Sequence, residues 1–145
     1  MRSEEFLQEV CQPSVEELVA DPTSFRRAWV AVTSLFHFAD YVALERDTRL
    51  ESVHREFADE FTDFSLVRDV ANASKHAELA RGPRKGLSAA HIDIGYGAAF
   101  SDGSYYSDGT SHSDASDVVR VVFHDEQIDL VNLCERCLHY LKAKC

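Results

Sequence analysis

The chain of 145 residues has few of the residues that mark specialised classes of protein. Its three prolines and six glycines are too few for a collagen-like or low-complexity chain, and its four cysteines are too few for a disulfide scaffold. No apolar run approaches the ~20 residues of a membrane span. The acidic start of the chain also lacks the apolar stretch of a signal peptide. These absences predict a single cytoplasmic domain over residues 1–145 with no membrane contact.

Cations are also scarce, with 15 Lys and Arg against 25 Asp and Glu, for a net charge of −10. This balance argues against a protein that coats DNA or RNA, because such binding needs many cations facing phosphates. The charge is unevenly distributed, however. Residues 68–86 carry a net charge of +3, whereas residues 1–67 carry −8 and residues 87–145 carry −5. The sequence therefore leaves room for a local anion site in the 68–86 stretch.

The spacing of apolar residues predicts a mainly α-helical bundle of about four to five helices. The strongest pattern follows Asp21 and Pro22, which are expected to begin a helix that ends near residue 45. The residues expected to face the core in this helix are Phe25, Trp29, Val32, Phe36, Ala39 and Ala43. Further helices are expected over residues 3–11 and 14–20, on either side of Pro13, over 50–61, over 64–80, and from about residue 125 onward.

An alternating pattern replaces the helical one at residues 92–96 and 118–123, and predicts β-strands there. The segment between them, residues 101–117, is rich in Ser, Asp and Gly and is expected to form a flexible loop, in which Tyr105 and Tyr106 could add a short strand. The carboxylates of this loop do not have the spacing of a calcium-binding motif. The sequence therefore predicts a small antiparallel β-hairpin or meander inserted before the C-terminal helix.

The helix expected over residues 64–80 separates into two faces. Leu66, Val70, Ala73 and Ala77 form an apolar face, and the opposite face carries Arg68, Asn72, Lys75 and His76. Cations, an amide and an imidazole on one face could hold a phosphodiester, with the imidazole moving a proton and the cations stabilising developing charge. A solvated helix face with no ligand is the alternative interpretation.

The segment Leu66-Val67-Arg68-Asp69-Val70-Ala71-Asn72-Ala73-Ser74-Lys75-His76 resembles the signature helix of HEPN-type proteins. This resemblance implies a small helical bundle, often dimeric, from bacterial toxin–antitoxin or phage-defence systems. Many such proteins are metal-independent ribonucleases that use an Arg and a His across a dimer interface. Here Ala71 occupies the position before Asn72 where the family commonly has an arginine, and Arg68 lies farther from His76 than is usual.

Three functions follow as hypotheses. The first is a HEPN-like accessory or regulatory protein. Its expected partners are a second copy and either RNA or another protein, with Lys75, Arg81, Arg84 and Lys85 binding the anion. The second is a metal-independent ribonuclease with His76, Asn72 and Arg68 as its catalytic residues. The third is a non-catalytic structural module that buries this helix face against a partner.

The pair Cys134 and Cys137 has the spacing of a metal or redox motif, but a zinc site needs two further ligands. Both cysteines fall in the apolar stripe of the C-terminal helix with Leu130, Leu133, Leu138 and Leu141. They are therefore predicted to be small buried residues. No metal ion and no cofactor is expected.

Overall fold

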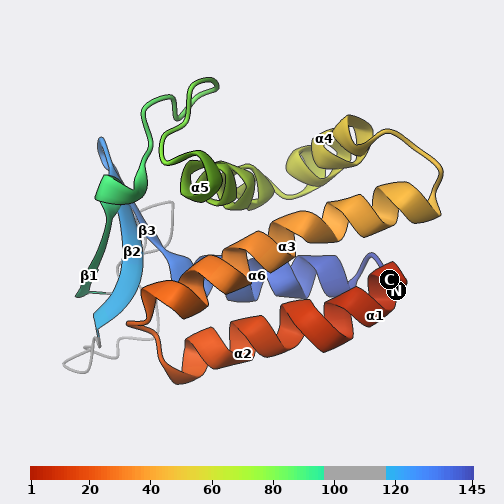
Figure 1. The fold of residues 1–145 in the computed structure, drawn as a ribbon, viewed down its shortest axis with the longest axis horizontal. Helices are drawn as coiled ribbons and strands as arrows, with labels where there is room; N and C mark the ends of the chain where they lie inside the picture. Colours follow the sequence, from red (N-terminus) through yellow and green to blue (C-terminus); the bar gives the residue numbers. More distant parts are fainter. Residues whose placement is uncertain (97–116) are drawn as a thin grey trace.

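The computed structural model describes residues 1–96 and 117–145 and confirms the mainly helical bundle. The central helix is α3 (Phe25–Glu45). In Figure 1 the first helical run, which ends in α2 (Gln12–Ala20), lies along one side of α3, whereas α4 (Leu50–Glu60) and α5 (Asp63–His76) lie along the other. The C-terminal helix α6 (Leu130–Lys142) packs behind α3 and against α2 and α5. No helix in the described ranges has both the length and the apolar character needed to cross a membrane.

A three-stranded antiparallel sheet caps one end of the bundle, as the predicted meander requires (Figure 1). Its strands, in the order β1-β2-β3, are β1 (Ile92–Tyr96), β2 (Asp117–Phe123) and β3 (Glu126–Asp129). Two expectations were wrong here. Residues 126–129 form a strand rather than helix, because Ile128 pairs with Val121 and is buried with it. Asp117 belongs to β2 rather than to the preceding loop; the rest of that loop, residues 101–116, lies outside the described residues.

The first helical run is continuous from Ser3 to Ala20, so the break expected at Pro13 is absent. Helix α1 (Ser3–Phe6) leads into a π turn over Leu7–Cys11, which leads directly into α2. Pro13 directly follows the π turn, in the segment labelled α2, and has no backbone N–H to donate there. The helix nevertheless passes through Pro13 and continues to Ala20.

Helix α3 buries a different face from the one predicted. Val32, Ala39 and Ala43 are buried as expected, but Phe25 and Trp29 are exposed and Phe36 is only partly buried. The buried positions are Ala28, Ala31, Val32, Ser34, Leu35, Phe38, Ala39, Val42 and Ala43. Neighbours surround α3 on several sides, and small alanines let them approach closely, so the buried face is centred away from the largest aromatic rings. The helix also begins later than expected, with Ser24 rather than Asp21 as its cap.

Aromatic rings join α4, α5 and α6 at the far end of the bundle. The Phe57 ring meets Phe64 edge to face at 5.2 Å between centroids and meets Tyr140 edge to face at 5.7 Å. Phe61 stacks on Tyr140 at 5.0 Å. Such pairs add to the free energy gained from burying the rings. They fix where α5 lies, and thereby where its polar face opens.

Helix α5 ends at His76, four residues before the predicted end. Ala77 adopts a left-handed conformation (φ 64°), which stops the helix. The chain then returns in a turn closed by Leu79, whose N–H donates to the Leu87 carbonyl at 2.8 Å. Both leucines are buried, although Leu79 would fall on the same side as Arg68 if the helix continued to residue 80 as predicted. Leu79 leaves the helix because its side chain gains more by packing into the core than by continuing a solvated helix.

The left-handed Ala77 gives a first prediction. A side chain in this conformation costs about 1–2 kcal/mol, and glycine avoids that cost. We therefore expect Ala77→Gly to raise the free energy of unfolding by about 0.5–1 kcal/mol, measured by urea denaturation. Ala80→Gly, an exposed neighbour without a positive φ, serves as the control and is expected to give no gain. Equal stability of wild type and Ala77→Gly would contradict the assignment of strain to Ala77.

Candidate functional site

The polar face of α5 is only partly open to solvent. Lys75 and His76, at the last turn, are exposed, whereas Arg68 and Asn72 are half-buried. The side chains of Lys75, His76 and Asn72 have no hydrogen bond or ion pair to any residue that the structure describes. Leu66, Val70 and Ala73 are buried on the opposite side, as predicted, but Ala77 is exposed beyond the helix end.

Arg68 and Arg84, two of the predicted site residues, meet at one buried carboxylate. Asp69 is 5% exposed, and its two oxygens accept from different arginines. Arg68 Nη2 lies 3.0 Å from Oδ1, and Arg84 Nη1 lies 2.9 Å from Oδ2. Arg84 Nε also donates to Glu126 Oε2 of β3 at 3.1 Å. In this Asp69 cluster (Arg68, Asp69, Arg84 and Glu126) both arginine charges are matched by carboxylates within the protein.

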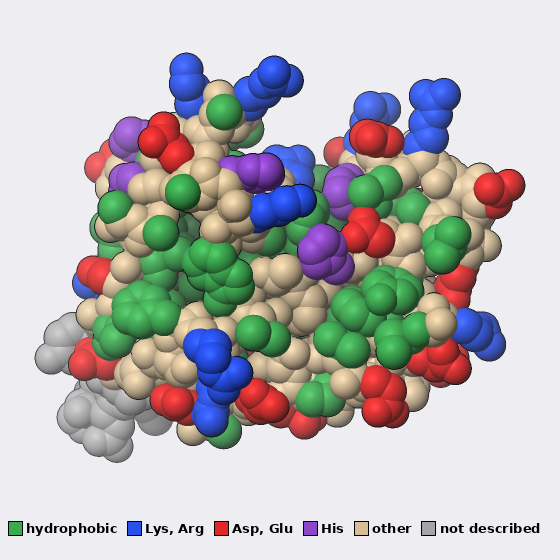
Figure 2. Space-filling model, viewed as in Figure 1, with side chains coloured by type: hydrophobic (Ala, Val, Ile, Leu, Met, Phe, Trp, Pro, Cys, Tyr) green, Lys and Arg blue, Asp and Glu red, His purple; other side chains and the backbone are tan. Residues whose placement is uncertain are grey.

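The remaining cations of the basic stretch point outward. Residues 77–88 form the turn after α5, which we call the basic turn; Arg81 and Lys85 are exposed on it and have no ion-pair partner among the described residues. Lys and Arg side chains project from this turn in Figure 2. Together with Lys75 and His76 they form the basic end of α5. Of the predicted anion-binding residues, Lys75, Arg81 and Lys85 are therefore free to meet a ligand, whereas Arg84 is held by carboxylates.

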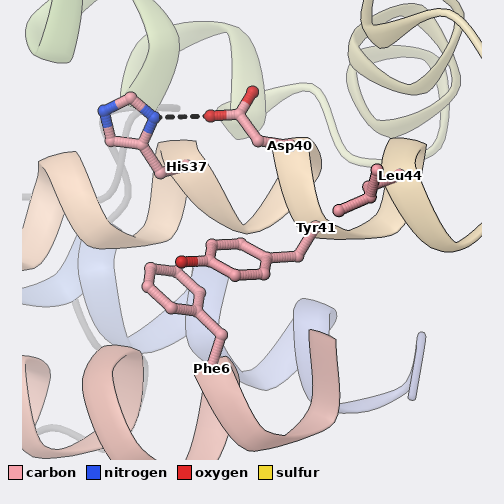
Figure 3. Close-up of a pocket in the computed structure, with 5 residues that line it drawn as sticks. All are labelled: Phe6, His37, Asp40, Tyr41 and Leu44. Atoms are coloured by element: carbon pink, nitrogen blue, oxygen red, sulfur yellow. Dashed lines mark hydrogen bonds and ion pairs between the residues drawn. The ribbon is translucent and has the colours of Figure 1, made fainter. Parts of the chain in front are cut away.

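A second group of polar side chains lies over the middle of α3, in a shallow surface depression bordered by Phe6, Tyr41 and Leu44 (Figure 3). His37 Nδ1 lies 2.7 Å from Asp40 Oδ2, and the Phe6 and Tyr41 rings stack below this pair at 4.1 Å. A carboxylate can orient an imidazole for proton transfer. In the described part of the chain, however, His37 has no hydrogen bond to a hydroxyl or thiol that it could activate.

His54 of α4 stacks on Phe36, with 4.9 Å between ring centroids. Its Nε2 atom is buried without a hydrogen-bond partner among the described residues. Burial lowers the pKa of His54 below its usual value, although the nearby Asp40 carboxylate opposes this shift. A neutral, partly buried imidazole of this kind packs as an aromatic ring, so His54 is a structural residue with a pH-dependent cost.

The cysteines match the prediction of small buried residues. Cys134 and Cys137 are fully buried and free, and burial raises the pKa of both thiols well above the usual range. Burial also raises the pKa of Cys11 to about 12. Such thiols are protonated and unreactive at neutral pH. Across the described ranges, no three His, Cys, Asp or Glu side chains are grouped so that they could hold a metal ion.

Two features that shape this site were not predicted from the sequence. Asp69 entered the predictions only through the net charge of residues 68–86, although a carboxylate in the helix at the edge of an apolar face is a signal for a buried ion pair. Trp29 was assigned to the core. The run of small and apolar residues at Ala28, Ala31, Leu35 and Phe38 would have indicated a buried face rotated away from that ring.

Comparisons with protein-family models, with curated proteins and with solved structures each gave no match to this chain. The resemblance of α5 to the HEPN signature helix therefore stays a prediction.

Removal of the Asp69 carboxylate tests the Asp69 cluster. Asp69→Asn leaves the half-buried Arg68 guanidinium without a counter-charge and Arg84 with Glu126 alone, so we expect the free energy of unfolding to fall by about 1–3 kcal/mol. Urea denaturation at neutral pH gives this value. The matched control is Asp59→Asn, an exposed carboxylate on α4 with no partner in the described ranges, for which a change within about 0.5 kcal/mol is expected. Equal effects of the two variants would show that the cluster does not stabilise the fold.

The buried imidazole of His54 gives a prediction for pH. Because the pKa of His54 is lowered in the folded state, the unfolded chain takes up a proton there first as pH falls. The contribution of the neutral His54 ring to the free energy of unfolding is therefore fully present above the unfolded-state pKa of about 6.5. It declines as the pH falls below that value. We expect His54→Phe to lose less stability than wild type between pH 7 and pH 5 in urea titrations. His139→Gln, which alters an exposed histidine of α6, is expected to keep the wild-type dependence.

Proposed function

We propose that this chain is a HEPN-like accessory or regulatory protein that binds RNA through the basic end of α5 and does not cleave it. The observation that carries this proposal is that the Asp69 cluster divides the cations of residues 68–86 into a matched and an unmatched group. Arg68 and Arg84 are matched by carboxylates inside the protein, whereas Lys75, Arg81 and Lys85 are exposed and without a partner in the described residues. Exposed, unmatched cations are the groups that contact phosphates.

The same division argues against catalysis. A ribonuclease of the HEPN type would need an arginine free to stabilise the charge that develops on the phosphorus oxygens. Arg68 is the only cation on the half-buried part of the α5 face, and its guanidinium faces Asp69. His76 stands exposed at the helix end, with no group beside it in the described structure to orient its ring. Cleavage by His76 would therefore lack both a free arginine to stabilise the developing charge and a group to orient the imidazole.

Binding of RNA at one end suits the rest of the surface, which is acidic. The flanking segments, residues 1–67 and 87–145, carry net charges of −8 and −5, which disfavours coating of the whole protein by a polyanion. A cytoplasmic location and a role in bacterial defence or a toxin–antitoxin system belong to this proposal as implications of the resemblance. The four free cysteines suit a reducing compartment.

Charge removal at the basic end tests the proposal. In fluorescence anisotropy with a labelled single-stranded RNA, the variant Lys75→Ala/Arg81→Ala/Lys85→Ala is expected to bind more weakly than wild type. Loss of three phosphate contacts should lower the slope of log K against log salt by about 2. The RNA is expected to stay intact with wild type and with His76→Ala.

The matched control removes three exposed cations elsewhere, in the variant Arg49→Ala/Arg55→Ala/Lys142→Ala; Arg49 directly precedes α4, Arg55 lies on α4 and Lys142 ends α6. It has the same net charge as the test variant and is expected to keep the wild-type salt slope. Equal weakening by both variants would refute a site at the basic end. Cleavage by wild type that disappears in His76→Ala would establish the ribonuclease alternative instead.

A further inference from the structure

Two aromatic side chains of α3 are exposed where a helical bundle would ordinarily bury them. Phe25 is 47% exposed and Trp29 is 42% exposed. They are the only aromatic residues among the large apolar side chains that the described structure leaves exposed. Because they are one helical turn apart, they lie side by side on the same face of α3. We call this pair the aromatic platform.

The aromatic platform lies next to α5, close to its basic end. Phe25 and Trp29 border a cleft of about 110 Å³ whose other wall includes Val70 and Ser74 of α5. Lys75 directly follows Ser74 and is exposed. The cleft is well below the roughly 300 Å³ of a small-molecule pocket. It is therefore too small to enclose a complete ligand, and the two side chains that border it stay partly exposed to solvent.

Cations border the platform on both sides. Arg26 lies between the two aromatic residues in sequence, is exposed and has no ion-pair partner among the described residues, whereas its neighbour Arg27 pairs with Asp21 at 3.4 Å. Figure 2 shows apolar side chains gathered over the first half of α3, with basic side chains on either side of them. The basic turn continues this positive surface beyond Lys75. The elements packed against the platform thus present cations at the edges and rings in the centre.

We propose that Phe25 and Trp29 form a base-stacking site for single-stranded RNA, with Arg26 and Lys75 contacting the phosphates that flank the stacked bases. This inference rests on the proposed function and specifies the form of RNA that the site takes. Exposed rings bordered by cations match the alternation of bases and phosphates in an unpaired strand. A duplex hides its base faces within the stack, so it could use the cations but not the rings.

A protein partner fits this surface less well than RNA does. The centres of protein–protein interfaces are depleted of charged residues. Here two cations without partners in the described structure, Arg26 and Lys75, would have to be desolvated at the edge of the contact. Phosphates would neutralise both cations. Charge complementarity therefore favours an unpaired nucleic-acid strand as the occupant.

The chain offers a direct readout, because Trp29 is its only tryptophan. Titration with a single-stranded oligouridylate is expected to quench the fluorescence of Trp29 saturably, with the same Kd that anisotropy gives. A self-complementary RNA duplex of equal length is expected to cause little quenching at the same degree of binding. Binding of both forms without any change in Trp29 fluorescence would overturn the inference.

Variants separate ring stacking from charge. Loss of one stacked base should weaken single-strand binding by about 5- to 150-fold, so we expect an effect of this size for Trp29→Ala. Trp29→Phe keeps an aromatic face and is expected to bind within about threefold of wild type, as is Val30→Ala, which alters an exposed neighbour on the same helix. Circular dichroism and thermal unfolding of each variant show whether the bundle is intact. If Trp29→Ala is unfolded, Phe25→Leu, which removes a ring and keeps an apolar side chain, provides the test.

The outcomes distinguish this inference from the proposed function. If the triple charge variant loses affinity while Trp29→Ala and Phe25→Leu bind as wild type, the base-stacking site is refuted and the phosphate site stands. If neither kind of variant changes RNA binding, the proposed function fails as well. If Trp29→Ala instead converts a dimer to a monomer in sedimentation velocity and leaves RNA affinity unchanged, the platform is an interface between copies, which also overturns the inference.

Discussion

The buried carboxylate of Asp69 is the interaction on which the rest of the site depends. A carboxylate removed from water costs several kcal/mol unless cations and hydrogen bonds replace the lost solvent. Asp69 meets this requirement with one arginine from its own helix and one from the turn that follows. Because Arg84 also reaches Glu126 on β3, the same ion pairs join α5, the basic turn and the sheet. The conformation of the turn and the direction in which its other cations point follow from that connection.

Local patterns in the sequence predicted the elements whose burial depends on contacts along a single face. The apolar stripe of α6 is buried at all its predicted positions, from Leu130 to Leu141, because that helix faces the core along a single side. The stripe of α3 was assigned wrongly because neighbours surround this helix on several sides. Helix ends were also misplaced. The first helical run continues through Pro13, and Leu79 lies beyond the end of α5, where its side chain is buried in the core.

The candidate site was predicted less completely than the fold, and distance along the chain is the reason. The helical spacing of residues in α5 correctly grouped Lys75 and His76 on an exposed surface. It could not show that Arg84, 15 residues after Asp69, turns back to that carboxylate, or that Glu126 lies 42 residues farther along in the same cluster. The net charge of residues 68–86 thus overstated the available cations. The exposure of Trp29 likewise depends on which sides of α3 the other elements cover.

The π turn at Leu7–Cys11 bears on how the length of this chain could vary. An i→i+5 hydrogen bond encloses one residue more than the α-helical bond, as the bond from the Gln12 N–H to the Leu7 carbonyl shows. A chain shortened by one residue in this stretch would keep an unbroken helix and the same contact faces on either side, with Phe6 still against Tyr41. It would also place Pro13 inside a regular helix, where the ring meets the carbonyl four residues earlier. Deletion of one residue from the π turn and replacement of Pro13 are therefore coupled changes. A version of this helix that is one residue shorter should lack both the extra residue and the proline.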